Sequence, residues 1–266
     1  MIDLHAHILP ALDDGPGDLD EALAMASIAS ADGIKALAAT PHVLPGAYDN
    51  SKDNILKAVQ EMNQHIKRQG IPLDIYPGAE YMLDPFLPGM IKEGEALTLN
   101  DGGKYILVEF PSHGIPSYAG QTLYEIALLG VTPIIAHPER NGDFLRDPDK
   151  LEFFLEKGAL AQLTSGSLTG LFGRKVQNLA MYCIEMGYCH FIGSDAHSAE
   201  HRVPVLSGAA RIVEESFGDA LGGLLVSGNP ARILAGQYIS STVTGGNARV
   251  VHRKRGFFSR LLMGRK

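Results

Sequence analysis

Short runs of β-type residues recur along the chain, and most of them precede a longer stretch with helical periodicity. The β-type runs cover residues 2–5, 34–40, 73–78, 105–110, 132–136, 159–164 and 189–193. Apolar residues at three- and four-residue spacing predict helices over residues 19–31, 54–69, 117–129, 151–156 and 175–186, with a late helix over residues 230–234 behind an Asn229 cap. Strands that alternate with helices are typical of a parallel sheet, either closed into a barrel or lying open.

The residues best suited to bind a metal stand at, or just beyond, the carboxyl ends of these predicted strands. They are His5, His7, His42, Glu80, Glu109, His137, Asp195 and His197. In a barrel all strand ends face one mouth, whereas an open sheet spreads them along an edge. The pattern therefore favours a seven-stranded barrel.

The spacing of these ligands indicates the chemistry of the site. His5 and His7, like Asp195 and His197, are separated by one residue, which places both side chains on one side of an extended segment. Carboxylates among imidazoles suit manganese, iron or zinc. The set exceeds one tetrahedral shell, so more than one ion is expected, with Glu80 bridging two of them. Two ions roughly 3.5 to 4 Å apart can clamp a phosphoryl oxygen and supply hydroxide, which is hydrolytic machinery.

Three further residues lie close to this set in the sequence. Asp14 is a candidate ligand, although Asp13-Asp14-Gly15-Pro16 reads equally well as a turn. Arg140 and Arg202 follow His137 and His197 by three and five residues. A guanidinium matches phosphate oxygens, so both are candidate substrate clamps, and surface arginine is the alternative.

The remaining histidines and both cysteines fit structural roles. His65, His113, His190, His201 and His252 are interpreted as ordinary polar residues, and Cys183 and Cys189 as core residues. A thiol-based phosphatase needs an arginine six positions after its cysteine, where this chain has Cys189 and Asp195. That route is therefore excluded.

Composition and charge narrow the class of protein. The 266 residues are 45% hydrophobic, which fits a globular chain of one large domain or two small ones. Two cysteines make no disulfide framework, and no leader or spanning segment is evident, so we expect a cytoplasmic protein. Residues 249–266 hold seven of the 23 basic residues and no acid, so the other 248 residues carry a net charge of −14. Such an acidic body argues against non-specific nucleic-acid binding.

The basic end stands apart from the rest. We expect a domain over residues 1–240 and a flexible tail over residues 241–266. The tail combines a charge cluster with apolar residues, in Arg253-Lys254-Arg255-Gly256-Phe257-Phe258. A solvated disordered tail is one interpretation, and docking on an acidic partner or weakly on an anionic membrane surface is the other.

The motifs taken together resemble the PHP superfamily, named for polymerase and histidinol phosphatase domains. Within it they are similar to the manganese-dependent tyrosine-protein phosphatases that accompany bacterial capsule and exopolysaccharide synthesis. The similarity runs from residue 1 to about residue 235, and basic residues from Arg249 onward depart from it. It is carried by Met1-Ile2-Asp3-Leu4-His5-Ala6-His7, Asp13-Asp14-Gly15-Pro16, Thr40-Pro41-His42, Gly78-Ala79-Glu80, Glu109-Phe110, Ala136-His137-Pro138-Glu139-Arg140 and Ser194-Asp195-Ala196-His197.

This resemblance implies a distorted, TIM-like βα barrel with up to three manganese ions, iron or zinc being alternatives. His5, His7, Glu80 and Asp195 would hold the first ion, Glu80, Glu109 and His137 the second, and Asp14, His42 and His197 the third. Arg140, Arg202 and Asp195 would be catalytic. The implied substrate is a phosphotyrosine protein, in particular a bacterial tyrosine autokinase. The alternatives are a phosphatase of a small metabolite such as histidinol phosphate, a phosphodiesterase or exonuclease, and a regulatory binding protein. The physiological substrate, the metal in the cell, the oligomeric state and the role of the tail stay open.

Overall fold

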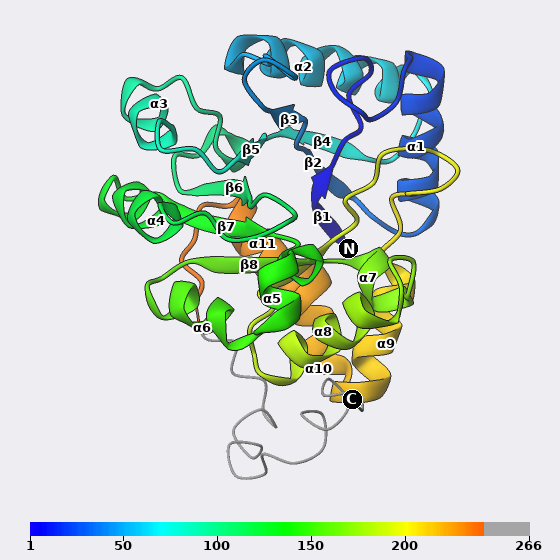
Figure 1. The fold of residues 1–266 in the computed structure, drawn as a ribbon. Coiled ribbons are helices and arrows are strands. Elements are labelled where there is room, and N and C mark those ends of the chain that lie inside the picture. Colours follow the sequence, from blue (N-terminus) through cyan, green and yellow to red (C-terminus); the bar gives the residue numbers. More distant parts are fainter. Residues whose placement is uncertain (242–266) are drawn as a thin grey trace.

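Parallel strands surrounded by helices make up residues 1–241, the part of the chain that this computed structural model describes (Figure 1). The strands are β1 (Ile2–Ala6), β2 (Ala36–Ala39), β3 (His42–Val43), β4 (Asp74–Pro77), β5 (Glu80–Met82), β6 (Tyr105–Glu109), β7 (Thr132–Ala136), β8 (Leu160–Thr164) and β9 (Phe191–Gly193). All seven expected strands are present, so the prediction of an α/β fold with parallel strands is confirmed.

The strands form two sheets, in the orders β1-β2-β4 and β3-β5-β6-β7-β8-β9. Two of the expected strands are each followed by a short strand that was not expected: Thr40 and Pro41 separate β2 from β3, and Gly78 and Ala79 separate β4 from β5. A parallel bridge between Ala6 and Ala196 links β1 to the segment that follows β9. No single continuous ladder closes on itself among the residues that the structure describes.

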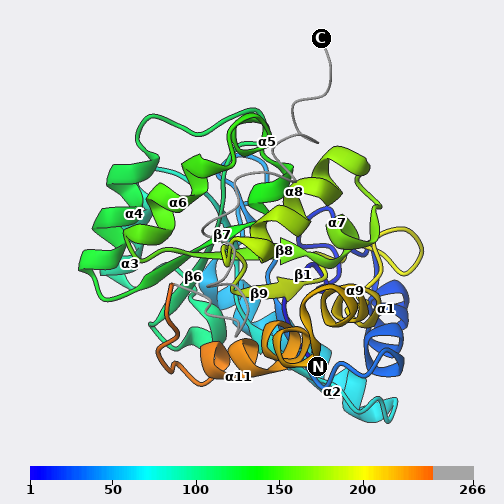
Figure 2. The ribbon, with the colours of Figure 1, turned by 90° about the horizontal axis from the view of Figure 1, so that it is seen from below.

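Helices cover both sides of the sheets. The α-helices are α1 (Leu19–Ala31), α2 (Lys52–Arg68), α3 (Leu87–Glu93), α4 (Ala119–Leu128), α5 (Gly142–Arg146), α6 (Asp149–Glu156), α7 (Ser165–Thr169), α8 (Arg174–Glu185), α9 (Ser207–Phe217), α10 (Asp219–Gly223) and α11 (Asn229–Leu234), with short turns η1 (Leu99–Asp101), η2 (Pro138–Arg140) and η3 (Leu224–Gly228). Helices α3, α4 and α6 lie on one side of the strands, and α1 and α9 on the opposite side (Figures 1 and 2). No helix within residues 1–241 has both the length and the apolar character that a membrane crossing needs.

The sequence-based expectation for the last helix was partly wrong. The helix over residues 230–234 exists, but Asn229 does not cap it, because α11 continues directly from η3 and Asn229 is its first residue. Instead, the Asn229 side-chain amide donates to the carbonyl of His190, 2.7 Å away. Asn229 therefore ties α11 to the segment that enters β9.

Two apolar clusters occupy the two faces of the strands. Leu4, Leu107, Ile134 and Phe191 belong to an inner cluster that Ile233 of α11 joins, whereas Ile106, Val108 and Ile135 belong to the cluster under the surrounding helices. Side chains alternate along a strand, so Glu109 shares the inner face of β6 with Leu107. The inner cluster thus forms the layer beneath the polar residues at the strand ends.

Candidate metal centre

All nine candidate ligands converge at the carboxyl ends of the strands. Three groups of them have ligand atoms close enough together to share an ion: His5, His7, Glu80 and Asp195; His42, Glu80 and Glu109; and His7, Asp14, His42 and His197. His137 joins them through Nε2, which lies 2.9 Å from Glu80 Oε1 and 3.8 Å from Glu109 Oε1. Glu80 and two histidines therefore contribute to more than one group.

Glu80 lies at the centre of this arrangement. Its Oε2 atom is 3.2 Å from His5 Nε2, 3.3 Å from His7 Nε2 and 3.3 Å from His42 Nδ1. The side chain is fully buried, and within residues 1–241 this oxygen has no hydrogen-bond partner. A buried carboxylate oxygen costs free energy unless a hydrogen bond, a proton or a cation satisfies it.

In three of the five candidate histidines, the nitrogen that points away from the cluster already has a hydrogen-bond partner. His5 Nδ1 lies 2.9 Å from Gln162 Oε1, which also accepts from the backbone N–H of His137 and so is an acceptor for His5. His7 Nδ1 donates to Asp13 Oδ2 at 2.6 Å, and His197 Nδ1 donates to the carbonyl of Asp195 at 3.0 Å. Such partners fix the tautomer of a metal-binding imidazole and turn its other nitrogen toward the ion.

The inner nitrogens then face a space that only a cation or protons can satisfy. His5 Nε2 and His7 Nε2 are 3.3 Å apart, both beside Glu80 Oε2. Two unprotonated nitrogens at this distance cannot bond to each other, whereas both can bind one ion. The residues therefore fit a divalent metal centre, and their nitrogen and oxygen donors match borderline and hard cations.

The pKa shifts of two candidate ligands also favour a metal centre. Burial lowers the pKa of His7, but hydrogen bonds to Asp13 and Glu80 outweigh it and raise that pKa to about 10. Burial and the nearby charge of Glu80 raise the pKa of Glu109 to about 8. Both shifts mean that the ligand set holds protons when no other positive charge neutralises it. A metal ion displaces such protons, because imidazole and carboxylate bind metals in their unprotonated forms.

The two arginines meet at one carboxylate. Arg140 Nη1 and Arg202 Nη2 both donate to Asp195 Oδ2, the second at 2.6 Å, while Asp195 Oδ1 faces His5 Nε2 at 3.4 Å. Their side chains are 25% and 27% exposed, so a substrate can reach them, whereas Asp195 is buried. Asp195 thus connects the two arginines, Arg140 and Arg202, which form a positively charged rim, to the ligand cluster.

Backbone conformation turns two of these side chains inward. His137 directly follows β7, Asp195 follows β9 by two residues, and their φ angles are 31° and 52°. Residues other than glycine rarely adopt this left-handed region, although histidine and aspartate do so more often than most. Strained residues of this kind cluster at functional sites.

Several side chains that serve the site were missed by the sequence analysis. Asp13 and Gln162 hold histidines, and Tyr48 stacks on His42 with ring centroids 5.7 Å apart. Phe172 lies under Arg140, whose guanidinium carbon is 4.8 Å from the ring centre. Gln162 inside a mainly apolar strand was an available signal, because a buried polar side chain requires a partner.

Three of the residues interpreted as structural, His190, Cys183 and Cys189, occupy buried places. His190 Nδ1 accepts from the N–H of Ala161 at 3.0 Å, and its Nε2 donates to the carbonyl of Ser241 at 2.7 Å. Cys183 and Cys189 are buried free thiols, as expected. His252 and nearly all of the expected tail, from residue 242 onward, lie outside the described residues.

Comparison with known proteins identifies relatives. A family model described as capsular polysaccharide synthesis, CpsB/CapC, matches residues 1–235. The chain is 40% identical over 221 residues to tyrosine-protein phosphatase YwqE of Bacillus subtilis, which covers 83% of this chain and 87% of YwqE. It is 29% identical over 246 residues to tyrosine-protein phosphatase CpsB of Streptococcus pneumoniae, which covers 90% of this chain and 100% of CpsB.

Solved structures agree. A structure from work on YwqE of B. subtilis and CpsB of S. pneumoniae, described as unique metal-dependent tyrosine phosphatases, superposes with a TM-score of 0.87 at 39% identity, covering 90% of this chain and 96% of that one. A dihydropyrimidinase from Brevibacillus agri gives a TM-score of 0.54 at 14% identity, covering 92% of this chain and 72% of that one, and shares the fold alone.

Proposed function

This chain belongs to the CpsB/CapC family of capsular polysaccharide synthesis, and we propose that it is a metal-dependent phosphatase that hydrolyses phosphotyrosine in a protein. The observation that carries the proposal is the position of Glu80. Its unpartnered oxygen lies among three imidazoles, and two substrate-accessible arginines stand beside the same cluster on Asp195. Phosphoryl transfer needs positive charge arranged in this way around the phosphoryl oxygens.

We assign the ions as follows. His5, His7, Glu80 and Asp195 would hold the first, and Glu80 and Glu109 would hold the second together with His137 or His42. Asp14, His42 and His197 would hold the third, and His7 belongs to the same group of close ligand atoms. Bound divalent ions in such a site polarise the phosphoryl group and supply a nucleophile at neutral pH. We propose manganese as the metal, with iron or zinc as alternatives, since these donors accept all three.

The protein's own side chains then have distinct tasks. Arg140 and Arg202 bind and orient the phosphoryl oxygens, because each guanidinium offers a planar fork of donors. Asp195 holds both arginines in place. Burial opposes its ionisation, but His5, His137 and the two arginines outweigh that effect and keep the pKa of Asp195 well below its usual value. Asp195 is therefore a carboxylate and an electrostatic anchor. A phenolate with a pKa near 10 leaves without a strong acid.

The setting of the family suggests the partner. We propose that the substrate is a phosphorylated bacterial tyrosine autokinase of polysaccharide synthesis and that the enzyme acts in the cytoplasm. We also propose that residues 1–240 are the catalytic domain and that the basic segment over residues 241–266 lies outside it.

The finer description of the fold belongs to this proposal as well. We infer a distorted seven-stranded barrel of the PHP type, in which β2 with β3 and β4 with β5 count as one interrupted strand each. Support comes from the order of the two sheets and from the hydrogen bonds His7 N–H to Ala196 O and Asp195 N–H to His5 O, at 2.8 and 2.7 Å.

An add-back assay tests the function. Protein stripped with a chelator is assayed on a phosphotyrosine peptide, histidinol phosphate and single-stranded DNA, while manganese, magnesium, zinc or iron is restored. We expect metal-restored turnover of the peptide that a His42→Ala, Asp195→Ala double variant loses and that a control variant of the exposed His113, His113→Ala, keeps. A preference for histidinol phosphate or DNA, or no turnover with any metal, would overturn the proposal.

A further inference from the structure

A cavity of about 150 Å³ lies directly beside the arginines. It is enclosed by the segment from Thr164 to Phe172 on one side and by residues of the segment 194–209 on the other. Arg202 and Ser194 are among the residues that line it, whereas none of the nine candidate ligands does so within the described part of the chain. The cavity is therefore a space separate from the metal centre but open to the same rim.

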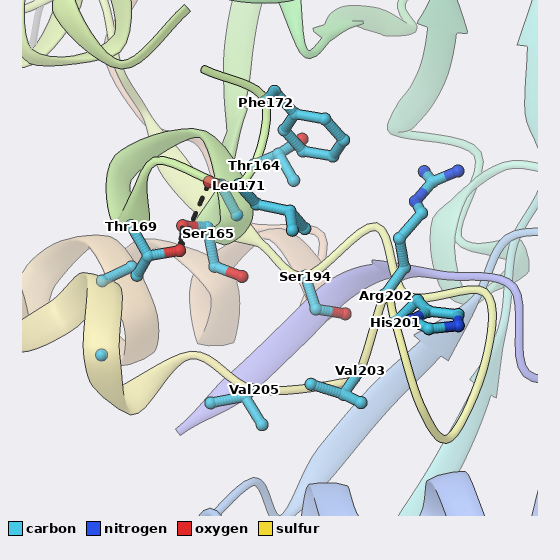
Figure 3. A pocket seen from close by; sticks show the side chains of 13 residues that line it. Thr164, Ser165, Thr169, Leu171, Phe172, Ser194, His201, Arg202, Val203 and Val205 are labelled. Atoms are coloured by element: carbon cyan, nitrogen blue, oxygen red, sulfur yellow. Dashed lines mark hydrogen bonds between the residues drawn. The ribbon is translucent and has the colours of Figure 1, made fainter. Parts of the chain in front are cut away.

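The walls of this cavity are mainly apolar. Leu171 and Phe172 lie on one side, and Val203 and Val205 face them from the other (Figure 3). A cavity of about 150 Å³ with apolar walls is large enough to bind benzene. Leu171 is 55% exposed, although removal of a leucine side chain from water lowers the free energy. A flat apolar group in the cavity would cover it.

One arginine lines the cavity, and the other contacts an aromatic ring that lines it. Arg202 lines it directly, and Phe172 lines it while lying under Arg140. The two arginines meet at Asp195 Oδ2, and the other oxygen of Asp195 faces the ligand cluster. A phosphoryl group held by the arginines therefore has the ligand cluster on one side and the cavity on the other. In phosphoryl transfer the nucleophile and the leaving group are in line, so the leaving group lies on the side away from the attack.

We propose that this cavity, which we name the aryl pocket, holds the aromatic ring of the phosphotyrosine side chain, and that Leu171 is a specificity-determining residue for aryl over alkyl phosphates. The inference rests on the proposed function, since the ring belongs to its substrate. It adds that selection of tyrosine comes from apolar packing against the leaving group, and that the metal centre itself does not discriminate between aryl and alkyl esters.

Binding of two phosphonates tests the pocket without turnover. Phenylphosphonate and methylphosphonate, which are not hydrolysed, are titrated by calorimetry into the manganese-loaded full chain. We expect the wild type to bind phenylphosphonate more tightly. Leu171→Ala should weaken phenylphosphonate by about fivefold to tenfold, because the shorter side chain covers less of the ring, and should leave methylphosphonate unchanged. The control is Leu128→Ala, which removes a leucine 67% exposed on α4 and should change neither affinity.

A second variant narrows the pocket. Gly208 lines it, and a Cβ at that position would lie 3.4 Å from Thr169 Cγ2, at ordinary contact distance. Gly208→Val should therefore fold, which thermal unfolding checks, and should weaken phenylphosphonate alone.

The outcomes separate the two proposals. Equal affinities of the wild type for both phosphonates, or equal losses of both in Leu171→Ala, would overturn the aryl pocket. The aryl pocket would also be overturned if Leu171→Ala lost turnover on a phosphotyrosine peptide but kept it on phenyl phosphate, since the pocket would then hold a neighbouring residue of the peptide. Selective binding of phenylphosphonate without any turnover of phosphotyrosine peptide would uphold the pocket and reject the proposed function.

Discussion

Asp13 allows the metal centre to be tested without removal of any candidate ligand. Its Oδ2 atom accepts from His7 Nδ1 at 2.6 Å and from the N–H of His42 at 2.9 Å, and its Oδ1 accepts from the N–H of Gly15 at 2.9 Å. Both carboxylate oxygens are therefore used as acceptors. One carboxylate orients two of the histidines that we assign to the ions.

Asp13→Asn keeps the shape of the side chain but replaces one acceptor by a donor. Either the His7 and His42 contacts or the Gly15 contact must then face an N–H₂ group, and the negative charge behind His7 is removed. Loss of such an outer partner costs about 10- to 100-fold in metal affinity. That range corresponds to about 1.4 to 2.8 kcal/mol.

The assay is competition for manganese between the apoprotein and a chelator of known affinity. Asp18→Asn is the control, because Asp18 caps α1 through a bond to the N–H of Glu21 in the same part of the chain, and asparagine caps a helix as well as aspartate does. We expect weaker binding in Asp13→Asn alone. An unchanged affinity, with the fold intact by circular dichroism, would refute the idea that Asp13 positions His7 for a metal.

Three further changes test other parts of the structure. Glu80→Gln should reduce the metal content, measured by mass spectrometry, from three ions to one, since Glu80 belongs to two of the three ligand groups; three retained ions would contradict the bridging role. Gly193→Ala should cost about 1 to 3 kcal/mol in urea unfolding, because its Cβ would lie 2.9 Å from His5 Cβ, whereas Gly89→Ala, with open space around it, should not destabilise. Burial lowers the pKa of His190 to about 4. Between pH 6.5 and 4 this imidazole is therefore protonated in the unfolded chain but not in the folded chain, and the folded state is destabilised. The stability advantage of wild type over His190→Gln should shrink by about 3 kcal/mol as the pH falls through that window, and parallel pH profiles of unfolding would reject it.

Strand positions and the ligand set were predictable from the sequence because both follow local rules. Side chains alternate along a strand, and parallel strands end at the same edge, so residues as far apart as His5 and Asp195 could be placed at one site without a structure. The interruptions after β2 and β4 were not predicted. Pro41, which lacks an N–H to donate to a ladder, was visible in the sequence, whereas the close packing at Gly78, where a Cβ would lie 2.9 Å from Leu99 Cδ2, becomes visible only in the structure.

The side chains that support the ligands were beyond the reach of such rules. Gln162 reaches His5 across 157 positions of sequence, and Phe172 meets Arg140 from a separate loop. No periodicity connects these pairs, because each contact depends on how two elements pack. Even the grouping of ligands around the ions depends on it: His7, assigned from the resemblance to one ion, lies close enough to contribute to two groups.

Substitution of a side chain that supports a histidine should affect metal binding differently from substitution of Glu80, the carboxylate at the centre. His5 is held from β8 by Gln162, His7 from a loop by Asp13, and His197 by the backbone of Asp195. Because these supports come from separate elements, removal of one should weaken only the histidines that it contacts, which are His7 and His42 in the case of Asp13. Glu80 has no such redundancy, since its Oε2 atom is the common neighbour of His5, His7 and His42. Metal affinity should therefore decline in steps when supports are removed, whereas removal of Glu80 should abolish binding in the two ligand groups that share it, because the buried negative charge at their centre is lost.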